Sequence, residues 1–457
     1  MTDISRRGFL AATSATALAA AVPRKPNFII FLFDDLGSHD IGYRGATDTR
    51  TPNIDALAAS GAQFTDWYSN APVCAPSRGA LLTGRYTLRN GVVNNGNPLR
   101  PGEKTIASVL KPGGYATGIL GKWHLGGTPD TVPNAHGFDY YLGFHDGCTD
   151  YYSHRFYWGE PKRVNFHDLW RNREEAFEDG QYLTELIARE AKGFIDAHHN
   201  EPFFLYVPFN AVHYPMHAPA KYVERFPKLA KERQMYAAML SAADDAVGGI
   251  MGALKHHGLL NDTCVFFTAD NGATTEKRGG LNQQPAAAGD NGRYRGFKFS
   301  LFDGGIHMPA VMSWPGVIPR GQTIHEVGMH MDILPTFAKA AGIELPGDRV
   351  IDGRDVLQMA QGRAKSPHDA VFWSSGGQLA ARQGYWKLVI DGKTFDRTPQ
   401  ARVALTGEDA LFLSNLDDDI GETRNQRGGH AAMVNDLERR TRAWAKECEE
   451  DRKAAQE

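Results

Sequence analysis

A cysteine and an arginine, four positions apart, are the residues best suited to chemistry. Cys74 and Arg78 flank Pro76 and Ser77, which favour the start of a helix. We expect Cys74 to lie just before that helix, whose first amide groups attract an anion. Arg78 would lie one turn inside it, where a guanidinium can bind an anion through two parallel hydrogen bonds. The spacing predicts a reactive cysteine beside an anion site, the alternative being an inert buried thiol.

Acidic and amide side chains follow two apolar runs that are typical of buried strands. Asp34 and Asp35 end the first run, and Asp270 and Asn271 follow the second. Carboxylates at the C-terminal ends of parallel strands point into the crevice where open α/β folds bind ligands. Four oxygen donors, without His or Cys, fit Ca²⁺ or Mg²⁺ better than zinc. The alternative is that each acid separately caps a helix or forms a turn.

Two basic residues alternate with an indole in the segment 121–126. Lys122 and His124 flank Trp123. In an extended segment, successive side chains point to opposite faces, so both basic groups would face one side and the indole the other. By themselves, such residues are more often solvated or structural than catalytic.

The elements that must position these residues alternate along the chain. Continuous apolar runs predict buried strands at 28–33, 203–207 and 264–268, and 115–120 is a short strand-like segment. Helical patterns occupy 52–60, 77–83, 181–197 and 233–256. This alternation predicts an α/β layered domain around a mostly parallel sheet. The polar segment 279–295 is typical of a long surface loop.

Composition changes again near residue 365 and predicts a second, smaller domain. Short strands at 371–374, 379–382 and 386–390 favour an antiparallel sheet, and 431–453 favours a charged terminal helix. We therefore divide the chain into a signal segment at 1–21, a catalytic domain at 22–365 and a C-terminal domain at 366–457.

The composition is that of an ordinary globular enzyme. The chain has 457 residues, 42% of them hydrophobic, and a formal net charge of −3. Without a long basic patch, nucleic acid is not expected as a partner. The four cysteines are scattered without a C-x-x-C pair, which favours buried thiols at Cys148, Cys264 and Cys448 over a disulfide framework.

The N-terminus is similar to an export signal. Ser5, Arg6 and Arg7 precede an alanine-rich stretch that ends at Ala21, as in twin-arginine signals. This resemblance implies passage through the twin-arginine translocase, cleavage after about twenty residues, and a periplasmic or secreted protein. The alternative is a short uncleaved anchor, although the apolar run is too short for a comfortable membrane span.

The segment Cys74–Arg85 resembles the signature of the sulfatase family. It matches the pattern C-x-P-x-R-x-x-L-x-T-G-R at every fixed position, and Gly121–Gly126 matches G-K-W-H-L-G without a change. The resemblance implies an alkaline-phosphatase-like α/β fold and hydrolysis of a sulfate monoester. It also implies that a formylglycine-generating enzyme oxidises Cys74 to an aldehyde, which hydrates to a geminal diol.

The hydrate has a chemical advantage over an ordinary alcohol. A simple alcohol that attacked sulfur would leave a sulfate ester, which water would have to cleave at sulfur again. A sulfated hydrate expels sulfate by breaking its own C–O bond, so covalent catalysis is split into two easier steps.

Roles for the remaining residues follow from the same resemblance. Asp34, Asp35, Asp270 and Asn271 would ligate calcium, with magnesium as the second choice, together with an oxygen of residue 74. Lys122 would contact the sulfate, and His124 would deprotonate the diol during elimination.

Two residues are expected at the ester oxygen of the substrate. His213 and Lys298 would hold this oxygen, and either could protonate the leaving group. His217 is expected to be a loop residue or a substrate contact. Asp303 and His307 stand where many relatives have Glu and Arg, and we expect them to support the site without touching the substrate.

The substrate is less defined by the sequence than the reaction. The aromatic and polar segment 140–158 suits a wall that binds sugar rings, or equally a loop that packs on the core. We expect a sulfated carbohydrate or another small sulfate ester, including aryl sulfates. The alternatives are a phosphomonoester or phosphonate-ester hydrolase of the same superfamily, and a non-catalytic binder of sulfated glycans.

Overall fold

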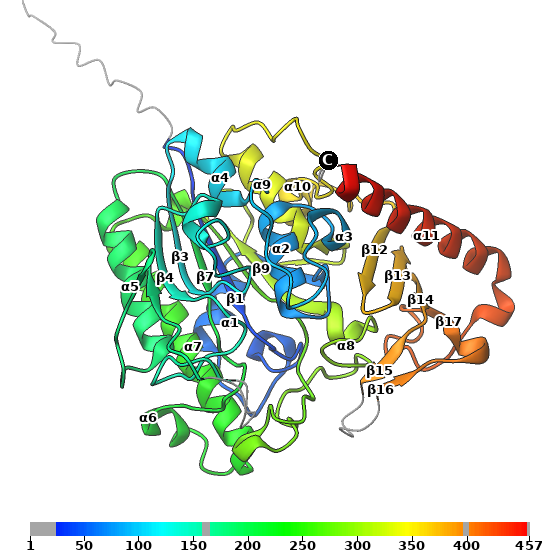
Figure 1. Ribbon diagram of the computed structural model, residues 1–457, viewed down its shortest axis with the longest axis horizontal. Helices are drawn as coiled ribbons and strands as arrows, with labels where there is room; N and C mark the ends of the chain where they lie inside the picture. Colours follow the sequence, from blue (N-terminus) through cyan, green and yellow to red (C-terminus); the bar gives the residue numbers. More distant parts are fainter. Residues whose placement is uncertain (1–23, 158–164, 396–401, 455–457) are drawn as a thin grey trace, which may run out of the picture.

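The computed structural model describes residues 24–157, 165–395 and 402–454 (Figure 1). The predicted export signal at 1–21 lies outside these residues. A large mixed sheet runs through the body of the molecule, with helices on both faces. A smaller antiparallel sheet stands beside it and is covered by the C-terminal helix α11 (Ala431–Ala454) (Figure 1).

The large sheet is mostly parallel, as predicted. Its strand order is β10-β2-β9-β8-β1-β7-β3-β4-β5-β6, and β11 also pairs with β2. The strands are β1 (Asn27–Phe33), β2 (Ala62–Tyr68), β3 (Ala116–Lys122), β4 (Tyr140–Phe144), β5 (Trp170–Arg171), β6 (Glu174–Glu175), β7 (Phe203–Pro208), β8 (Thr263–Ala269), β9 (His307–Ser313), β10 (Gln322–Ile324) and β11 (Gly328–Met329). β1 pairs in parallel with β7 and β8, whereas β9 runs antiparallel to β8 and β2. Neither β2 nor β9 was predicted from the sequence.

Strand pleating assigns the helices to the two faces of the sheet. Gly118 pairs with Leu205, which pairs with Ile29, so Gly118 and Phe28 belong to opposite faces. On one face, Phe194 of α5 (Leu183–His198) lies against Gly118, where any side chain would collide with the ring. On the other face, Phe337 of α9 (Ile333–Ala340) stacks on Phe28 with ring centroids 4.3 Å apart.

Each face has its own layer of helices. α1 and α5 contact α7 in one layer, and α2 and α4 contact α9 in the other. The helices are α1 (Pro52–Ala59), α2 (Cys74–Thr83), α3 (Thr87–Asn90), α4 (Ile106–Leu110), α5 (Leu183–His198), α6 (Ala220–Val223), α7 (Lys231–His256), α8 (Asp303–Ile306), α9 (Ile333–Ala340) and α10 (Leu357–Ala360). The predicted long helices at 181–197 and 233–256 correspond to α5 and α7.

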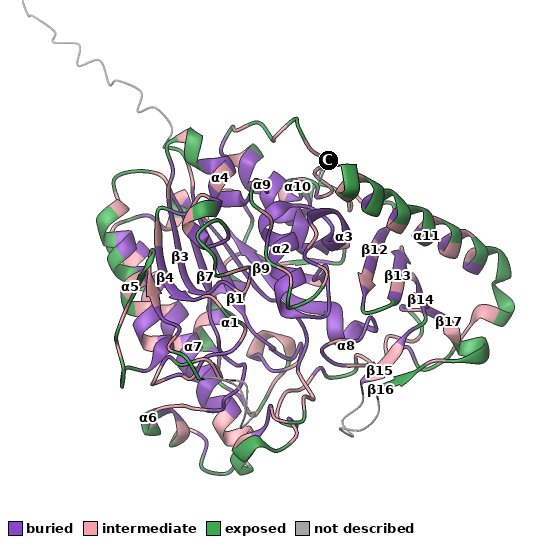
Figure 2. Cartoon of the chain, viewed as in Figure 1, coloured by how far each residue is buried: buried purple, intermediate pink, exposed green. Residues whose placement is uncertain are grey.

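Among the described residues, α7 is long and apolar enough to cross a membrane by length and composition alone. It packs against α5, and 67% of its most apolar window is buried inside the protein (Figure 2). These are properties of a core helix, because its apolar side chains are already covered by the sheet and its neighbours.

The smaller sheet has the order β12-β13-β14-β17, with antiparallel pairing throughout. Its strands and the adjacent hairpin are β12 (Val371–Ser375), β13 (Gln378–Gln383), β14 (Trp386–Ile390), β15 (Lys393–Phe395), β16 (Arg402–Ala404) and β17 (Leu411–Asn415). Trp373 and Val389 pack with Tyr68 and Ile306 of the large domain in one buried cluster. The division at 365/366 stays a prediction, although the strands begin where the sequence indicated.

Candidate active site

The predicted site residues meet at one end of the large sheet. β1, β3, β7 and β8 are parallel, so their carboxyl ends lie together. The backbone joins these ends, because the Asp34 amide donates to the Ala211 carbonyl at 2.9 Å and the Asp270 amide donates to the Phe33 carbonyl at 2.9 Å. The loops that carry the metal-ligand candidates are thereby tied to the segment that carries His213.

Asp34 is the centre of the cluster. The thiol of Cys74 lies 3.5 Å from Oδ1 of Asp34, and Nζ of Lys122 donates to Oδ2 at 2.5 Å. Arg78 is 3.4 Å from the same oxygen. Burial alone would raise the pKa of Asp34, but the positive charge of Lys122 and its neighbours outweighs it and holds the pKa well below its usual range. Asp34 is therefore ionised at neutral pH.

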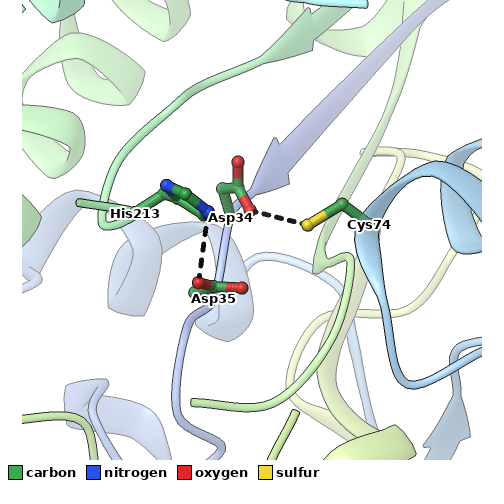
Figure 3. A group of neighbouring side chains, drawn as sticks. All are labelled: Asp34, Asp35, Cys74 and His213. Atoms are coloured by element: carbon green, nitrogen blue, oxygen red, sulfur yellow. Dashed lines mark hydrogen bonds and ion pairs between the residues drawn. The ribbon is translucent and has the colours of Figure 1, made fainter. Parts of the chain in front are cut away.

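Asp35 lies beside His213, with Nε2 of His213 3.6 Å from Oδ2 of Asp35 (Figure 3). Its backbone is in the left-handed region, with φ of 56°. This conformation is uncommon for a residue other than glycine and often marks a functional position. Nζ of Lys298 donates to the Asp35 carboxylate at 3.0 Å, and the Asn271 amide donates at 2.7 Å. Burial raises the pKa of Asp35 to about 6 despite the charge of Lys298.

Cys74 is the first residue of helix α2, whereas the sequence predicted a helix start near Ser77. Pro76 fits inside the first turn because the amides of that turn have no partner within the helix. The Ala75 amide donates to Asn95 at 3.0 Å, and the Ser77 amide donates to the Val73 carbonyl at 3.2 Å. Fewer helix amides are therefore free to attract an anion than the sequence led us to expect.

The thiol of Cys74 is enclosed. The residue is 1% exposed, and burial raises its pKa well above the ordinary value. An unmodified thiol here would be protonated and a poor nucleophile.

The guanidinium of Arg78 is occupied by a carboxylate. Its Nε and one terminal nitrogen donate to Oδ2 of Asp270 at 3.0 and 2.7 Å, and its other terminal nitrogen donates to the Lys122 carbonyl at 3.2 Å. The guanidinium that was predicted to bind a substrate anion therefore binds Asp270, because a fully buried guanidinium requires a paired charge.

Lys122 and His124 do not share one extended face. β3 ends at Lys122, and His124 has a φ of 58°, so the chain turns where the sequence suggested a continuous strand. His124 still lies next to the cluster: burial, together with the charges of Lys122 and Arg78, holds its pKa well below the ordinary value. Its buried Nδ1 atom has no hydrogen-bond partner in the described structure. A neutral imidazole with a free nitrogen can accept a proton.

His213 and Lys298 form a pair on the other side of Asp35. Nε2 of His213 lies 3.4 Å from Nζ of Lys298, and Nδ1 is 2.7 Å from the Tyr214 carbonyl. Because a carbonyl only accepts, Nδ1 carries the hydrogen and Nε2 is the acceptor. Burial lowers the pKa of His213 to about 4. His217 is separate from this pair and contacts Asp150 at 3.3 Å.

Several side chains of the site lie close enough together to hold a metal ion. Ligand atoms of Asp34, Asp35, Cys74 and His213 all lie within 4.8 Å of one another. Oδ1 of Asn271 is buried without a hydrogen-bond partner among the described residues, as expected of an oxygen that binds a metal. His213 thus joins the group that the sequence had limited to oxygen donors. Asp270, the fourth predicted ligand, already accepts hydrogen bonds on both oxygens.

Sequence reasoning missed one charged residue of this site. Glu276 lies 3.0 Å from Nζ of Lys298, and Oη of Tyr214 donates to it at 3.4 Å. Burial would raise the pKa of Glu276, but Lys298 and then His213 lower it to about 2. Its position six residues after Asp270 is the only signal the sequence offered.

Asp303 and His307 do not contact the catalytic side chains directly in the described structure. Asp303 accepts from Tyr68 at 2.9 Å and from Lys387 at 2.6 Å, so it joins the two sheets. His307 bonds the Thr65 carbonyl at 2.6 Å. Their support of the site is therefore indirect.

The aromatic segment at 140–158 has a mainly structural role within its described part, which ends at residue 157. Tyr141 and Tyr151 are fully buried. Oη of Tyr151 donates to the carbonyls of Asn210 and His213 at 2.8 and 2.9 Å, which fixes the loop that carries the histidine.

Comparison with known proteins identifies the family of this chain. The family described as Sulfatase matches residues 26–343. N-acetylgalactosamine-6-sulfatase of Rattus norvegicus is 37% identical over 384 residues, which cover 80% of this chain and 71% of the relative. Arylsulfatase A of Homo sapiens is 34% identical, with 92% of this chain and 87% of the relative covered.

Among solved structures, Ps i-CgsB in complex with k-i-k-neocarrahexaose superimposes with a TM-score of 0.81 at 31% identity. The superposition covers 92% of this chain and 93% of that chain. The chain therefore belongs to the sulfatase family and has its alkaline-phosphatase-like fold. It is a sulfuric ester hydrolase.

Proposed function

We propose that this enzyme hydrolyses sulfate monoesters of a sulfated carbohydrate, with a formylglycine made from Cys74 as the nucleophile and calcium as the metal. The supporting observation is the convergence of Cys74 with Asp34 and Lys122 at the carboxyl ends of parallel strands. A carbohydrate substrate is supported by the relatives, since one is named for N-acetylgalactosamine and another was solved with k-i-k-neocarrahexaose.

The reaction converts a sulfate monoester and water into an alcohol and inorganic sulfate. The hydrated aldehyde would supply a hydroxyl for attack on sulfur and a second one whose deprotonation expels sulfate. A calcium ion held by Asp34, Asp35, Asp270 and Asn271 would supply positive charge next to the sulfate oxygens.

The charge of each remaining side chain indicates its role in the reaction. Lys122 and Lys298 bring positive charge to opposite sides of the cluster and attract the sulfate group. Neutral His124 accepts a proton from the diol. We assign the His213–Lys298 pair to the ester oxygen, because Lys298 carries protons and Nε2 of His213 is an acceptor 3.4 Å from Nζ of Lys298. Arg78 holds Asp270 in place.

The test combines protein chemistry with substrate profiling. Peptide mass spectrometry of active protein should find an aldehyde at residue 74. Sulfated monosaccharides and oligosaccharides should be desulfated faster than an aryl sulfate or a phosphate monoester. An active preparation with only unmodified thiol at residue 74 would exclude the formylglycine mechanism, and a preference for phosphate monoesters would exclude the proposed reaction.

The metal is tested separately. Chelation should remove activity, and Ca²⁺, or less effectively Mg²⁺, should restore activity and raise the melting temperature, since binding to the folded state stabilises it. Stoichiometric zinc in purified active enzyme would contradict this assignment.

We also propose that the enzyme is exported through the twin-arginine translocase. The motivating residues are Arg6 and Arg7. Because Cys74 is 1% exposed in the folded protein and this route carries folded proteins, oxidation must precede folding in the cytoplasm. Replacing both arginines with lysine should leave active, modified enzyme in the cytoplasm. Efficient export of that variant would contradict the proposal.

A further inference from the structure

A fully buried histidine, His330, links three elements of the large domain. It begins the short 3-10 turn His330–Asp332. Its Nδ1 lies 3.2 Å from Oγ of Ser77 in α2, and its Nε2 lies 3.2 Å from Oγ1 of Thr268 in β8. Thr268 in turn donates to the Pro309 carbonyl in β9 at 2.9 Å. No role in catalysis or metal binding has been assigned to any of these four residues.

The direction of each hydrogen bond in this link follows from its last member. A hydroxyl has one hydrogen, and that of Thr268 goes to the Pro309 carbonyl, so its oxygen accepts from Nε2 of His330. Nδ1 is then the acceptor, and Ser77 donates to it. Burial lowers the pKa of His330 to about 3, so the ring is neutral at neutral pH. Both ring nitrogens of the histidine therefore have a defined partner.

The two ends of this link belong to the segments that carry the catalytic centre. Ser77 follows Cys74 by three positions, about one helical turn, and directly precedes Arg78. Thr268 lies in β8, two positions before Asp270. Arg78 also donates to Asp270 at 2.7 Å. Two successive residues of α2 are thus tied to the end of β8, one through an ion pair and the other through the buried histidine.

The turn that begins at His330 also holds the chain on the other side of Cys74. The Met331 amide donates at 3.0 Å to Oδ1 of Asn70, which is 1% exposed and lies four positions before Cys74. An apolar side chain could fill the place of His330 without burying two polar nitrogens. Apolar packing has no direction, however, whereas hydrogen bonds do. A histidine at this position therefore fixes how α2 is oriented against β8.

We propose that His330 is a positioning residue for the reaction, which fixes the orientation of α2 and thereby the place of residue 74 relative to the metal-binding carboxylates. This inference rests on the proposed function, in which residue 74 supplies the nucleophile. With both nitrogens occupied, His330 acts only through Ser77 and Thr268. A misplacement of about 1 Å at a reacting group can lower the rate about 100-fold, so a link outside the site can control the rate.

The test compares full-length variants with 4-nitrophenyl sulfate as the probe. His330→Phe keeps a ring and removes both hydrogen bonds. Its kcat should fall by about 10–100-fold, the usual cost of losing a group that orients a functional side chain. KM should change little, because the lysines assigned to the sulfate have other partners. His330→Gln, whose amide both donates and accepts, should recover most of the lost kcat.

A milder variant tests the same link from its other end. Ser77→Ala removes one hydroxyl group and should also lower kcat. Adding it to His330→Phe should cause no further loss, because the effects of two changes within one hydrogen-bonded link are not additive. If His330→Phe fails to fold, Ser77→Ala decides the question by itself.

Two controls separate positioning from a loss of stability or of the aldehyde. Thr441→Val removes a fully buried hydroxyl that donates to the Leu437 carbonyl in α11 at 2.6 Å. This variant should lower the melting temperature without changing kcat. Peptide mass spectrometry should find the same aldehyde content at residue 74 in every variant as in the parent.

Several outcomes would overturn the inference. They are a parent-like kcat in His330→Phe with a lower melting temperature, a loss of kcat that matches a loss of aldehyde, a His330→Gln variant as slow as His330→Phe, and additive effects of Ser77→Ala and His330→Phe. Failure of the proposed function is distinct from these, because Cys74→Ala would then retain turnover whatever the variants of His330 do.

Discussion

Two of the buried charge clusters in the described structure invite comparison, one at the catalytic centre and one between the two sheets. In the catalytic cluster, Asp34 has cationic neighbours, yet Oδ1 of Asn271 and Nδ1 of His124 have no partner in the described structure. In the inter-sheet cluster, Lys387 lies 2.6 Å from Asp303 and 3.1 Å from Glu422. Both clusters are fully buried, so burial of charge does not distinguish them.

The two clusters differ in where their charged and polar groups find partners. A buried charge is tolerated when neighbouring groups pair with it. The inter-sheet cluster finds its ion pairs within the chain, and it serves to join the domains. The catalytic cluster leaves donors and acceptors for a metal and a substrate to complete. Unpaired polar atoms at the ends of parallel strands are therefore the better sign of function here.

Removing the proposed nucleophile should have the largest effect. We expect Cys74→Ala to lose activity by several orders of magnitude, because loss of a covalent nucleophile costs on the order of 10⁶-fold in well-studied hydrolases. Stability should change by only about 1–2 kcal/mol, since a small buried side chain is replaced by a slightly smaller one. Turnover of a sulfated substrate and thermal melting measure the two effects. Substantial residual turnover would contradict the assignment of Cys74.

A substitution in the inter-sheet cluster should lower stability and leave activity nearly unchanged. Lys387→Met leaves Asp303 and Glu422 buried without their lysine, and breaking a buried pair costs about 3–5 kcal/mol. Stability should fall by this order, while the kcat of the folded fraction changes little. Lys339→Met is the matched control: Lys339 pairs with Asp355 at 2.9 Å but is exposed, so its loss should change the melting temperature little. Equal effects of the two variants on thermal melting would show that the buried cluster is not structural.

Glu276→Gln tests whether Glu276, which was not predicted from the sequence, contributes to catalysis. Glu276 is a positioning residue for Lys298, and loss of a group that orients a functional side chain typically costs about 10–100-fold in activity. We expect kcat to fall by that order, with an altered pH–rate profile and little change in melting temperature.

Two variants serve as references for Glu276. Glu276→Asp should recover part of the activity. Glu185→Gln, which removes an exposed partner of Lys221, should have no effect. A loss of stability without a change in the pH–rate profile would instead indicate a purely structural role for Glu276.

The smallest expected effect is a pH dependence of stability from the inter-sheet cluster. Burial raises the pKa of Glu422 to about 7, against the opposing charge of Lys387. Because the folded-state pKa lies above the ordinary value of 4.5, the folded protein binds the proton more tightly. The contribution of protonated Glu422 to folding stability is fully present below pH 4.5 and is lost as the pH rises through 7. Glu422→Gln should flatten melting temperature against pH in this window, and an unchanged slope would refute the assignment.

The sequence alone predicted the layered α/β fold and indicated residues that the structure brings together at one end of the sheet. Buried parallel strands are continuous apolar runs, and their ends carry the acids, so Asp34 and Asp270 could be placed at one edge of the sheet. The signature around Cys74 indicated the family. Local pattern was sufficient for these features because each depends on residues that are close together in the chain.

Only the tertiary structure decided which groups each side chain contacts. Arg78 binds Asp270, which lies 192 residues away along the chain. His124 has a φ of 58°, so it does not continue the extended strand that the sequence predicted. Strands such as β9 were missed because their partners come from distant segments. The pairing of Glu276 with Lys298 was not predicted, since it arises when separate loops fold against one another. Such contacts depend on three-dimensional distance and burial, which spacing along the chain does not encode.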